Sequence, residues 1–512
     1  MKTTLGEVCA PVATLQPSST PSDEFTYFDI GGIDNETNRI AETKTVTGRE
    51  APSRARQVAR TGDILFSTVR TYLKKIARID RDYPNPVAST GFTVIRAAEG
   101  VSSQFLFFRV LSEDFLQPLH ALQSGSSYPA VRDKDVFAQP IPLPPSREQE
   151  RIVAKLDALL SRVAAGEAAA RRALERLKRY RAAVLHAAVT GELTRDWRKT
   201  HKPDETGAQL LKRLLQERRA LWEEAELKRL HAAGKPPKDD KWKRRYLEPE
   251  LPKPNSLPKL PRGWASVSID QLGWTSGYGT SVKCTYEAKG PAVLRIPNIR
   301  NRELDFADLK FATNSKDVSE EDFVTPGDLL LIRTNGSVDL IGRAAIAIAT
   351  PQRKCSFASY LIRFRLVGDE SLWSWVSLTW GSDVLRLAIR SRAATTAGQY
   401  NVSLSGLADL PLPLPPLAEQ EVIVREVESR LMAADRLVAT LNRQLDRART
   451  TRQSLLREAF AGKLIPQDPK DEPASVLLER IRAAREAEAT KPKAKRMPKP
   501  KSTIVRRSLL EV

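Results

Sequence analysis

One unusual phrase occurs twice in this chain, as PLPPSREQERIV at residues 142–153 and as PLPPLAEQEVIV at residues 413–424. The two copies are 271 residues apart. The same offset holds farther along, where VLHAAVTGEL at 184–193 faces LLREAFAGKL at 455–464, and no gap is needed in between. Because loops tolerate insertions and packed helices do not, the constant offset predicts a rigid element of fixed length in each copy.

Both copies are predicted to be single long helices. Pro145 and Pro416 cannot lie inside a helix but can directly precede one. Gly191 and Gly462 stand where a residue with left-handed backbone would close each helix. In the first copy, Ser146 is followed three residues later by a glutamine, which predicts a capping box. The second copy has a leucine in place of that serine, so a weaker or different cap is expected there.

The apolar residues of these helices recur with the 3.5-residue period of a coiled-coil seam. Isolated helices of this composition would bury little surface, so the two are expected to pack on each other in antiparallel orientation. The seam positions are Leu156, Val163, Ala170, Leu177 and Val184 in the first helix, and Val427, Leu431, Ala434, Val438, Leu441, Leu445 and Ala448 in the second.

The repeat extends beyond the helices. Upstream, TGDILFSTVRTYLKKIARI at 61–79 resembles PGDLLLIRTNGSVDLIGRAAI at 326–346, and downstream AQLLKRLLQERR at 208–219 resembles SVLLERIRAARE at 475–486. Each unit is therefore a globular domain, a long helix and a short accessory helix. The predicted order is a first globular domain (1–145), a long helix (146–191), an accessory helix with a Pro- and Lys-rich linker (192–262), a second globular domain (263–416), a second long helix (417–463), and an accessory helix with a basic tail of disordered composition (464–512).

The globular domains mix strand-like with helical segments. DILFSTV, FTVIRA, DLLLIRT and ASYLIRFRL are rich in β-branched and aromatic residues, whereas 102–122 and 371–393 favour helix. The predicted fold class is mixed α/β, with two copies of a globular domain joined by two long antiparallel helices that form a coiled coil. The duplication predicts a pseudo-two-fold internal repeat.

Composition limits the class of function. The chain has 512 residues and an apolar fraction of 41%, enough for several folded cores. Its net charge of +20 favours a polyanionic partner, and nucleic acid is the first candidate. The three cysteines lie far apart and predict a reducing, cytoplasmic location, and the chain lacks an apolar run long enough to cross a membrane.

Motifs for catalysis are missing from the sequence. It contains no GxxxxGK[ST] and no GxGxxG phosphate loop, and its four histidines show no metal-ligand spacing. The charged run PPKDDKW at 236–242 lies in the linker and is interpreted as a solvated surface. No catalytic residue, metal site or cofactor is therefore predicted for this chain.

The chain resembles the specificity subunit of Type I restriction–modification systems. The resemblance rests on GDILFSTVRTYLKKIA, on SGSSYPAVRDKDV, on the two PLPPxxEQExIV helix starts and on the TGEL and AGKL helix ends. It implies a non-catalytic subunit that recognises an asymmetric, bipartite DNA sequence, with helices that set the spacer. It also implies two copies of an adenine methyltransferase subunit that uses S-adenosylmethionine and, through them, a restriction subunit that uses ATP and magnesium.

The candidate DNA-contacting residues lie in loops after strand ends and in polar turns before the long helices. Arg, Asn, Gln, Ser and Thr side chains can contact base edges or phosphates. The alternative for each loop is an ordinary solvated turn. The candidates are Arg70, Tyr72, Lys74, Lys75, Ser126, Ser127 and Tyr128 in the first domain, and Arg333, Thr334, Asn335, Ser337, Thr396, Gln399, Tyr400 and Asn401 in the second.

Two other functions fit parts of the pattern. A stand-alone DNA-binding regulator with two half-site domains would share the duplication, and a coiled-coil tether with protein-binding ends would share the helices. The positive charge and the strand-end loops argue against the tether. The hypothesis that the chain is an enzyme is not supported by any cluster of residues in the sequence.

Overall fold

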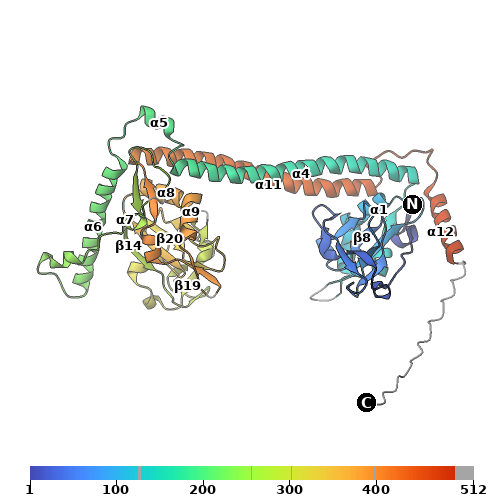
Figure 1. The fold of residues 1–512 in the computed structure, drawn as a ribbon, viewed down its shortest axis with the longest axis horizontal. Helices are drawn as coiled ribbons and strands as arrows, with labels where there is room; N and C mark the ends of the chain where they lie inside the picture. The colour runs from blue at the N-terminus through green and yellow to red at the C-terminus, as the bar shows by residue number, and fades with distance from the viewer. Residues whose placement is uncertain (125–128, 255–256, 301, 397, 490–512) are drawn as a thin grey trace, which may run out of the picture. The chain divides into compact units, whose positions relative to one another are not determined.

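The computed structural model describes residues 1–124, 129–254, 257–300, 302–396 and 398–489 (Figure 1). The chain forms two compact units, Met1–Ala170 with Arg443–Val512, and Arg171–Asn442. Each unit contains one globular domain and one end of each of two long helices.

The globular domain of the first unit has two four-stranded sheets. One has the order β2-β11-β8-β9 and is antiparallel throughout; the other has the order β6-β3-β10-β7 and contains one parallel pair, β3 with β10. The strands are β1 (Lys2–Thr4), β2 (Cys9–Ala10), β3 (Glu24–Phe28), β4 (Ile33–Asp34), β5 (Arg39–Ile40), β6 (Lys44–Thr47), β7 (Ala55–Val58), β8 (Ile64–Ser67), β9 (Ile76–Arg78), β10 (Pro86–Ser89), β11 (Phe92–Ala97) and β12 (Pro140–Pro142).

Among the described residues, three short α-helices complete this domain: α1 (Ser103–Val110), α2 (Glu113–Ala121) and α3 (Asp133–Phe137). Strand β8 is buried on both faces, as its run of apolar residues requires. Its Phe66 packs in one core with residues of α1 and α2 such as Phe105 and Phe115, whereas Leu65 faces a second core with Phe28 and Phe92.

The globular domain of the second unit repeats the fully antiparallel sheet, whereas its other sheet has the parallel pair at one edge instead of in the middle. The order β14-β24-β20-β22 is again fully antiparallel, and β15-β19-β16-β23 again contains one parallel pair, β16 with β23. The strands are β13 (Ala265–Ser268), β14 (Gly273–Tyr278), β15 (Cys284–Thr285), β16 (Ala292–Leu294), β17 (Ile299–Arg300), β18 (Glu303–Leu304), β19 (Lys310–Ala312), β20 (Asp328–Ile332), β21 (Thr334–Asn335), β22 (Ala344–Ile346), β23 (Cys355–Phe357), β24 (Leu361–Leu366), β25 (Ala394–Thr396), β26 (Gln399–Asn401) and β27 (Pro411–Leu414).

Its helices are α7 (Ile269–Leu272), α8 (Glu370–Trp380), α9 (Asp383–Arg390) and α10 (Leu404–Ala408). The predicted helical stretches 102–122 and 371–393 are each divided into two helices. In both domains a serine, Ser112 or Ser382, adopts extended backbone at the break and precedes the second helix. The mixed α/β fold and its internal duplication are confirmed, down to this shared interruption.

The two long helices are α4 (Ser146–Val189) and α11 (Leu417–Phe460), each of 44 residues. In the first unit, Leu156 near the start of α4 shares a core with Leu456 near the end of α11. In the second unit, Val184 near the end of α4 shares a core with Val427 near the start of α11. The helices therefore run in opposite directions, and their predicted seam positions are all buried or half-buried.

The ends of the helices differ in how well the sequence predicted them. Gly191 and Gly462 have φ values of +76° and +71°, as predicted. The predicted capping box is wrong. Ser146 donates its hydroxyl to the carbonyl of Gly100 at 2.9 Å. Gln149, which is fully buried, accepts from the backbone N–H of Ser102 at 2.9 Å and donates to the carbonyl of the proline five residues earlier at 3.0 Å. Contacts with the globular domain therefore replace the local cap.

The helices after α4 and α11 pack on globular domains. The short α5 (Arg195–Thr200) follows α4, and α6 (Gly207–Ala232) buries Leu210 and Leu214 in the core of the second domain. In the other unit, α12 (Ala474–Ala489) buries Leu477 and Ile481 in the core of the first domain. Each accessory helix therefore braces a globular domain.

The Pro- and Lys-rich linker folds back on α6. Trp242 of the linker stacks on Trp222 of α6 with ring centroids 6.1 Å apart, and Tyr246 accepts a hydrogen bond from Arg218 at 2.5 Å. Within the described residues, none of the helices is both long and apolar enough to cross a membrane.

Candidate nucleic-acid interface

In the first domain, the loop after β8 lies beside the polar turn that precedes α3. The backbone N–H of Arg70 donates to the carbonyl of Pro129 at 2.7 Å, and Val131 donates to the carbonyl of Thr68 at 3.0 Å. The two predicted DNA-contacting segments of this domain are therefore brought together. The predicted residues Ser126, Ser127 and Tyr128 lie outside the described residues.

The backbone of this loop holds Tyr72 toward solvent. Arg70 and Lys74 have φ values of +49° and +50°, in the left-handed region that residues other than glycine adopt only at a cost in free energy. Between them, Thr71 is buried and accepts a hydrogen bond from Gln123. The loop is thus anchored at Thr71, and Tyr72 is 52% exposed.

The two lysines of the loop already have partners within the domain. Lys74 forms an ion pair with Glu113 at the start of α2. Lys75 donates to the carbonyl of Ile33 at 2.6 Å. A DNA phosphate would have to compete with these two partners for the lysines. Of the predicted residues in this loop that the structure describes, Tyr72 is the most exposed, and Arg70 is half-buried.

In the second domain, the two predicted segments form one small sheet, β21-β26-β25. Thr334 pairs with Asn401, and Asn335 pairs with Tyr400. The Thr334 hydroxyl also donates to Gln399 Oε1 at 3.3 Å. Nearby, Asn335 accepts from the backbone of Ser337, and Thr396 pairs through its backbone with Gln399.

The two domains build this region on the same backbone frame. In the first, Thr68 donates its N–H to the carbonyl of Gly91 at 3.0 Å and accepts from Val131. In the second, Arg333 donates its N–H to the carbonyl of Tyr360 at 2.8 Å and accepts from Val402 at 3.0 Å. Thr68 and Arg333 therefore occupy equivalent positions, and their side chains differ.

A buried ion pair fixes the other end of each strand. Asp63, which precedes β8, accepts hydrogen bonds from Arg96 Nε at 2.9 Å and Nη2 at 2.6 Å. Asp328, at the start of β20, accepts from Arg365 Nε at 2.7 Å and Nη2 at 2.9 Å. Such two-pronged pairs are geometrically specific, so each recognition loop extends from a strand held in a fixed position.

The sequence prediction missed these pairs, although a signal was present. A Gly-Asp pair stands at the start of each strand, and both glycines adopt positive φ, +91° at Gly62 and +86° at Gly327. Each pairing strand also carries an arginine, in FTVIRA and in LIRFRL. The Gly-Asp that occurs in both domains, together with an arginine on the otherwise apolar partner strand, could have predicted both Asp–Arg pairs.

Two tyrosines of the second domain were also missed. Tyr278 ends β14, is 43% exposed and lies under the Arg333 guanidinium, whose Cζ is 4.4 Å from the ring centroid. Tyr360 precedes β24 and is 45% exposed. The sequence signal for Tyr278 was weak, because the residue lies in the Gly- and Ser-rich stretch TSGYGTS at 275–281.

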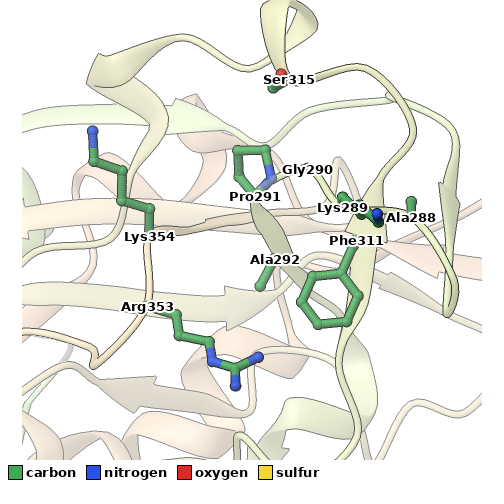
Figure 2. Close-up of a pocket in the computed structure, with 9 residues that line it drawn as sticks. All are labelled: Ala288, Lys289, Gly290, Pro291, Ala292, Phe311, Ser315, Arg353 and Lys354. Carbon is green, nitrogen blue, oxygen red and sulfur yellow. The ribbon is translucent and has the colours of Figure 1, made fainter.

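A second basic area of this domain forms a hollow of about 650 Å³ lined by Lys289, Ser315, Arg353 and Lys354 (Figure 2). The cationic side chains point in different directions and do not converge on one point (Figure 2). Lys354 also lies 3.6 Å from Glu320. The hollow therefore has the charge of an anion-binding surface without the convergent donors of a built site.

The possible metal ligands and the buried thiols of the described residues give no reactive group. They contain no group of three or more His, Cys, Asp or Glu side chains placed to hold a metal ion. Burial raises the pKa of the Cys9 thiol to about 12 and that of Cys355 to about 11. Both thiols therefore stay protonated at neutral pH, which makes them poor nucleophiles.

Comparison with known proteins now gives the class. Residues 5–176 match the model of the Type I restriction modification DNA specificity domain. The EcoKI specificity subunit of Escherichia coli K12 is 27% identical over 406 residues, which cover 78% of this chain and 75% of that protein. The StySPI specificity subunit of Salmonella potsdam is 25% identical over 76% of this chain and 73% of its own length.

Solved structures agree with the sequence matches. A chain from a study of complex assembly and conformational transition of the type I R-M system is 26% identical, with a TM-score of 0.62, over 90% of this chain and 98% of that one. The HsdS subunit of Thermoanaerobacter tengcongensis is also 26% identical, with a TM-score of 0.50, over 90% of this chain and 97% of its own.

Residues 5–176 therefore match the DNA specificity domain of Type I restriction–modification systems, and most of the chain is similar to the specificity subunits of such systems. The predicted resemblance is confirmed, and the matches support it over a stand-alone regulator or a protein tether. Within such systems the chain is the non-catalytic recognition subunit.

Proposed function

We propose that this chain recognises an asymmetric, bipartite DNA sequence, with one half recognised by each globular domain. The observation that carries the proposal is the shared backbone frame after β8 and after β20, which presents Thr68 in one domain and Arg333 in the other. Base identity is read by side chains and by local DNA shape. The same backbone arrangement with different side chains would allow the two domains to recognise two different half-sites.

The proposed contacts are those of the two loop regions. The first domain would use Arg70, Tyr72, Lys74 and Lys75 with the turn at 126–128. The second would use Arg333 and the small sheet β21-β26-β25, whose hydroxyl and amide side chains can pair with base edges. Because Lys74 is paired with Glu113, we assign it to phosphate contacts, where exchange of one anion for another is simple.

The long helices are proposed to set the distance between the half-sites and to dock the methyltransferase subunits. Two copies are expected, because each half of the chain supplies the same helix start. In both, a buried glutamine donates to the carbonyl five residues earlier, Gln149 to Pro144 and Gln420 to Pro415. The restriction subunit would join through the methyltransferases.

The cofactors of the reaction belong, in this proposal, to those partners. S-adenosylmethionine would be held by the methyltransferase subunits, and ATP and magnesium by the restriction subunit. A location in the cytoplasm follows from the proposed substrate, which is the DNA of the cell and any DNA that enters it.

Methylome sequencing tests the proposal. Host cells with the gene intact should carry adenine methylation at one bipartite motif, and deletion of this gene alone should abolish it. Return of the intact gene to the deletion strain is the control and should restore the methylation. Methylation that persists unchanged after the deletion would contradict the proposal.

A further inference from the structure

Arg333 lies at one end of the sheet, where β14 and β20 end and β24 begins. Strand β20 ends at Ile332, which pairs with Leu361 at the start of β24. Strand β14 ends at Tyr278, which pairs with the next residue of β24, Ile362. The Arg333 side chain lies over the Tyr278 ring, and its backbone N–H donates to Tyr360.

The Arg333 guanidinium has no hydrogen-bond or ion-pair partner among the described residues. Its Nε is buried and unpaired. Four other arginines of the described chain also have a buried, unpaired Nε, but in each of them another nitrogen of the guanidinium has a partner: they are Arg109, Arg181, Arg295 and Arg363. An unsatisfied charged donor is costly, so an acceptor from outside the chain is the natural partner.

The geometry limits what that acceptor can be. A guanidinium is planar and carries its N–H groups in one plane, and the contact with the Tyr278 ring restricts where the guanidinium of Arg333 can lie. Guanine offers two acceptors side by side in the major groove, O6 and N7, and arginine pairs with both. Around Arg333 lie Thr334 and Gln399, neutral groups suited to base edges.

We infer that Arg333 recognises a guanine in the half-site of the second domain, and that Tyr278 is the positioning residue that holds its guanidinium in plane. This inference rests on the proposed function and adds to it the identity of one base. At the equivalent position of the first domain, the described residues offer no counterpart. Its Thr68 is 7% exposed and donates its hydroxyl to the carbonyl of Gly91 at 3.0 Å.

The test uses the complex of this chain with its methyltransferase subunit and a duplex carrying the methylated motif. Each guanine of the motif is replaced in turn by 7-deazaguanine, which lacks the N7 acceptor. One replacement, in the half-site of the second domain, should weaken wild-type binding roughly tenfold to a hundredfold. The same replacement should leave binding by Arg333→Ala unchanged, because the contact is already lost.

A matched control is available in the same domain. Arg295 also stacks on a tyrosine, Tyr286, at 5.8 Å, but its guanidinium is paired with Asp308 at 3.0 Å. Arg295→Ala should keep the full response to 7-deazaguanine. Thermal unfolding of each variant identifies any loss of fold.

Variants of the tyrosine separate positioning from bulk stability. Tyr278→Phe keeps the ring and should keep guanine discrimination, although it loses the hydrogen bond that the hydroxyl accepts from Leu404. Tyr278→Ala should lose most of the discrimination. If Arg333→Ala weakens binding to all duplexes equally and still responds to 7-deazaguanine, Arg333 contacts phosphate and the inference is wrong. If the wild-type complex binds no bipartite motif at all, the proposed function itself has failed.

Discussion

Glu419 offers the sharpest test of how the scaffold holds the second domain. Its carboxylate is 1% exposed and accepts hydrogen bonds from Arg198 at 2.5 Å, from Thr194 at 2.6 Å and from Trp264 Nε1 at 2.9 Å. It therefore joins the start of α11 to the segment after α4 and to the first residues of the second domain. We predict that Glu419→Gln destabilises the second unit.

The magnitude follows from these contacts. A hydrogen bond to a charged group contributes about 1.5–3 kcal/mol, and removing one partner of a buried ion pair costs about 3–5 kcal/mol. The Arg198 side chain is 20% exposed, so water compensates part of the loss. We expect a loss of about 3 kcal/mol. Tryptophan fluorescence during urea unfolding measures it, because all eight tryptophans lie in the second unit.

The equivalent residue of the other repeat, Glu148, is the control. It is 6% exposed and has no hydrogen-bond partner within the described residues, and burial raises the pKa of its carboxyl above the usual 4.5. Its ionisation therefore opposes folding above about pH 4.5. Glu148→Gln should be neutral or stabilising at pH 7, with no gain at pH 4, as followed by far-ultraviolet circular dichroism. Equal losses in both variants would refute this account.

Three further predictions concern other parts of the scaffold. The pKa of Glu7 is lowered to about 2 by Thr3, Arg482 and the Thr4 amide, so its contribution to stability should be present above about pH 4.5 and lost toward pH 2; Glu7→Gln should flatten the acid unfolding curve measured by circular dichroism. Cysteines at Leu156 and Leu455 should crosslink within one chain upon oxidation, and a crosslink from position 156 only to position 427 would contradict the antiparallel packing. Seven residues inserted into both long helices should lengthen each by about 10 Å, and the methylated half-sites should separate by about three base pairs; a motif with changed bases and an unchanged spacer would contradict the assigned roles.

The sequence predicted the features that depend on local pattern. The doubled phrase, the seam and the closing glycines predicted both long helices, because periodicity and backbone conformation are encoded by neighbouring residues. The segments after β8 and before α3 were each predicted as candidates from their polar composition, but nothing in the sequence indicated that they lie side by side. Their role in DNA binding stays a prediction.

What the sequence did not predict depends on contacts between distant residues. The Asp63–Arg96 pair joins residues on two strands, and the tertiary contact of Gln149 replaced a local cap that the pattern favoured. In the same way, Lys74 looked free for DNA, but Glu113 from α2 lies against it. The stack of Arg333 on Tyr278 joins residues 55 positions apart, so no local pattern could indicate it.

The central claim is that each domain recognises its own half of the DNA target. The most direct measurement is the methylome of cells in which residues 263–416 are exchanged for the matching domain of a relative. The account predicts a motif in which one half changes, while the other half and the spacer stay the same. A motif altered in both halves at once would contradict it.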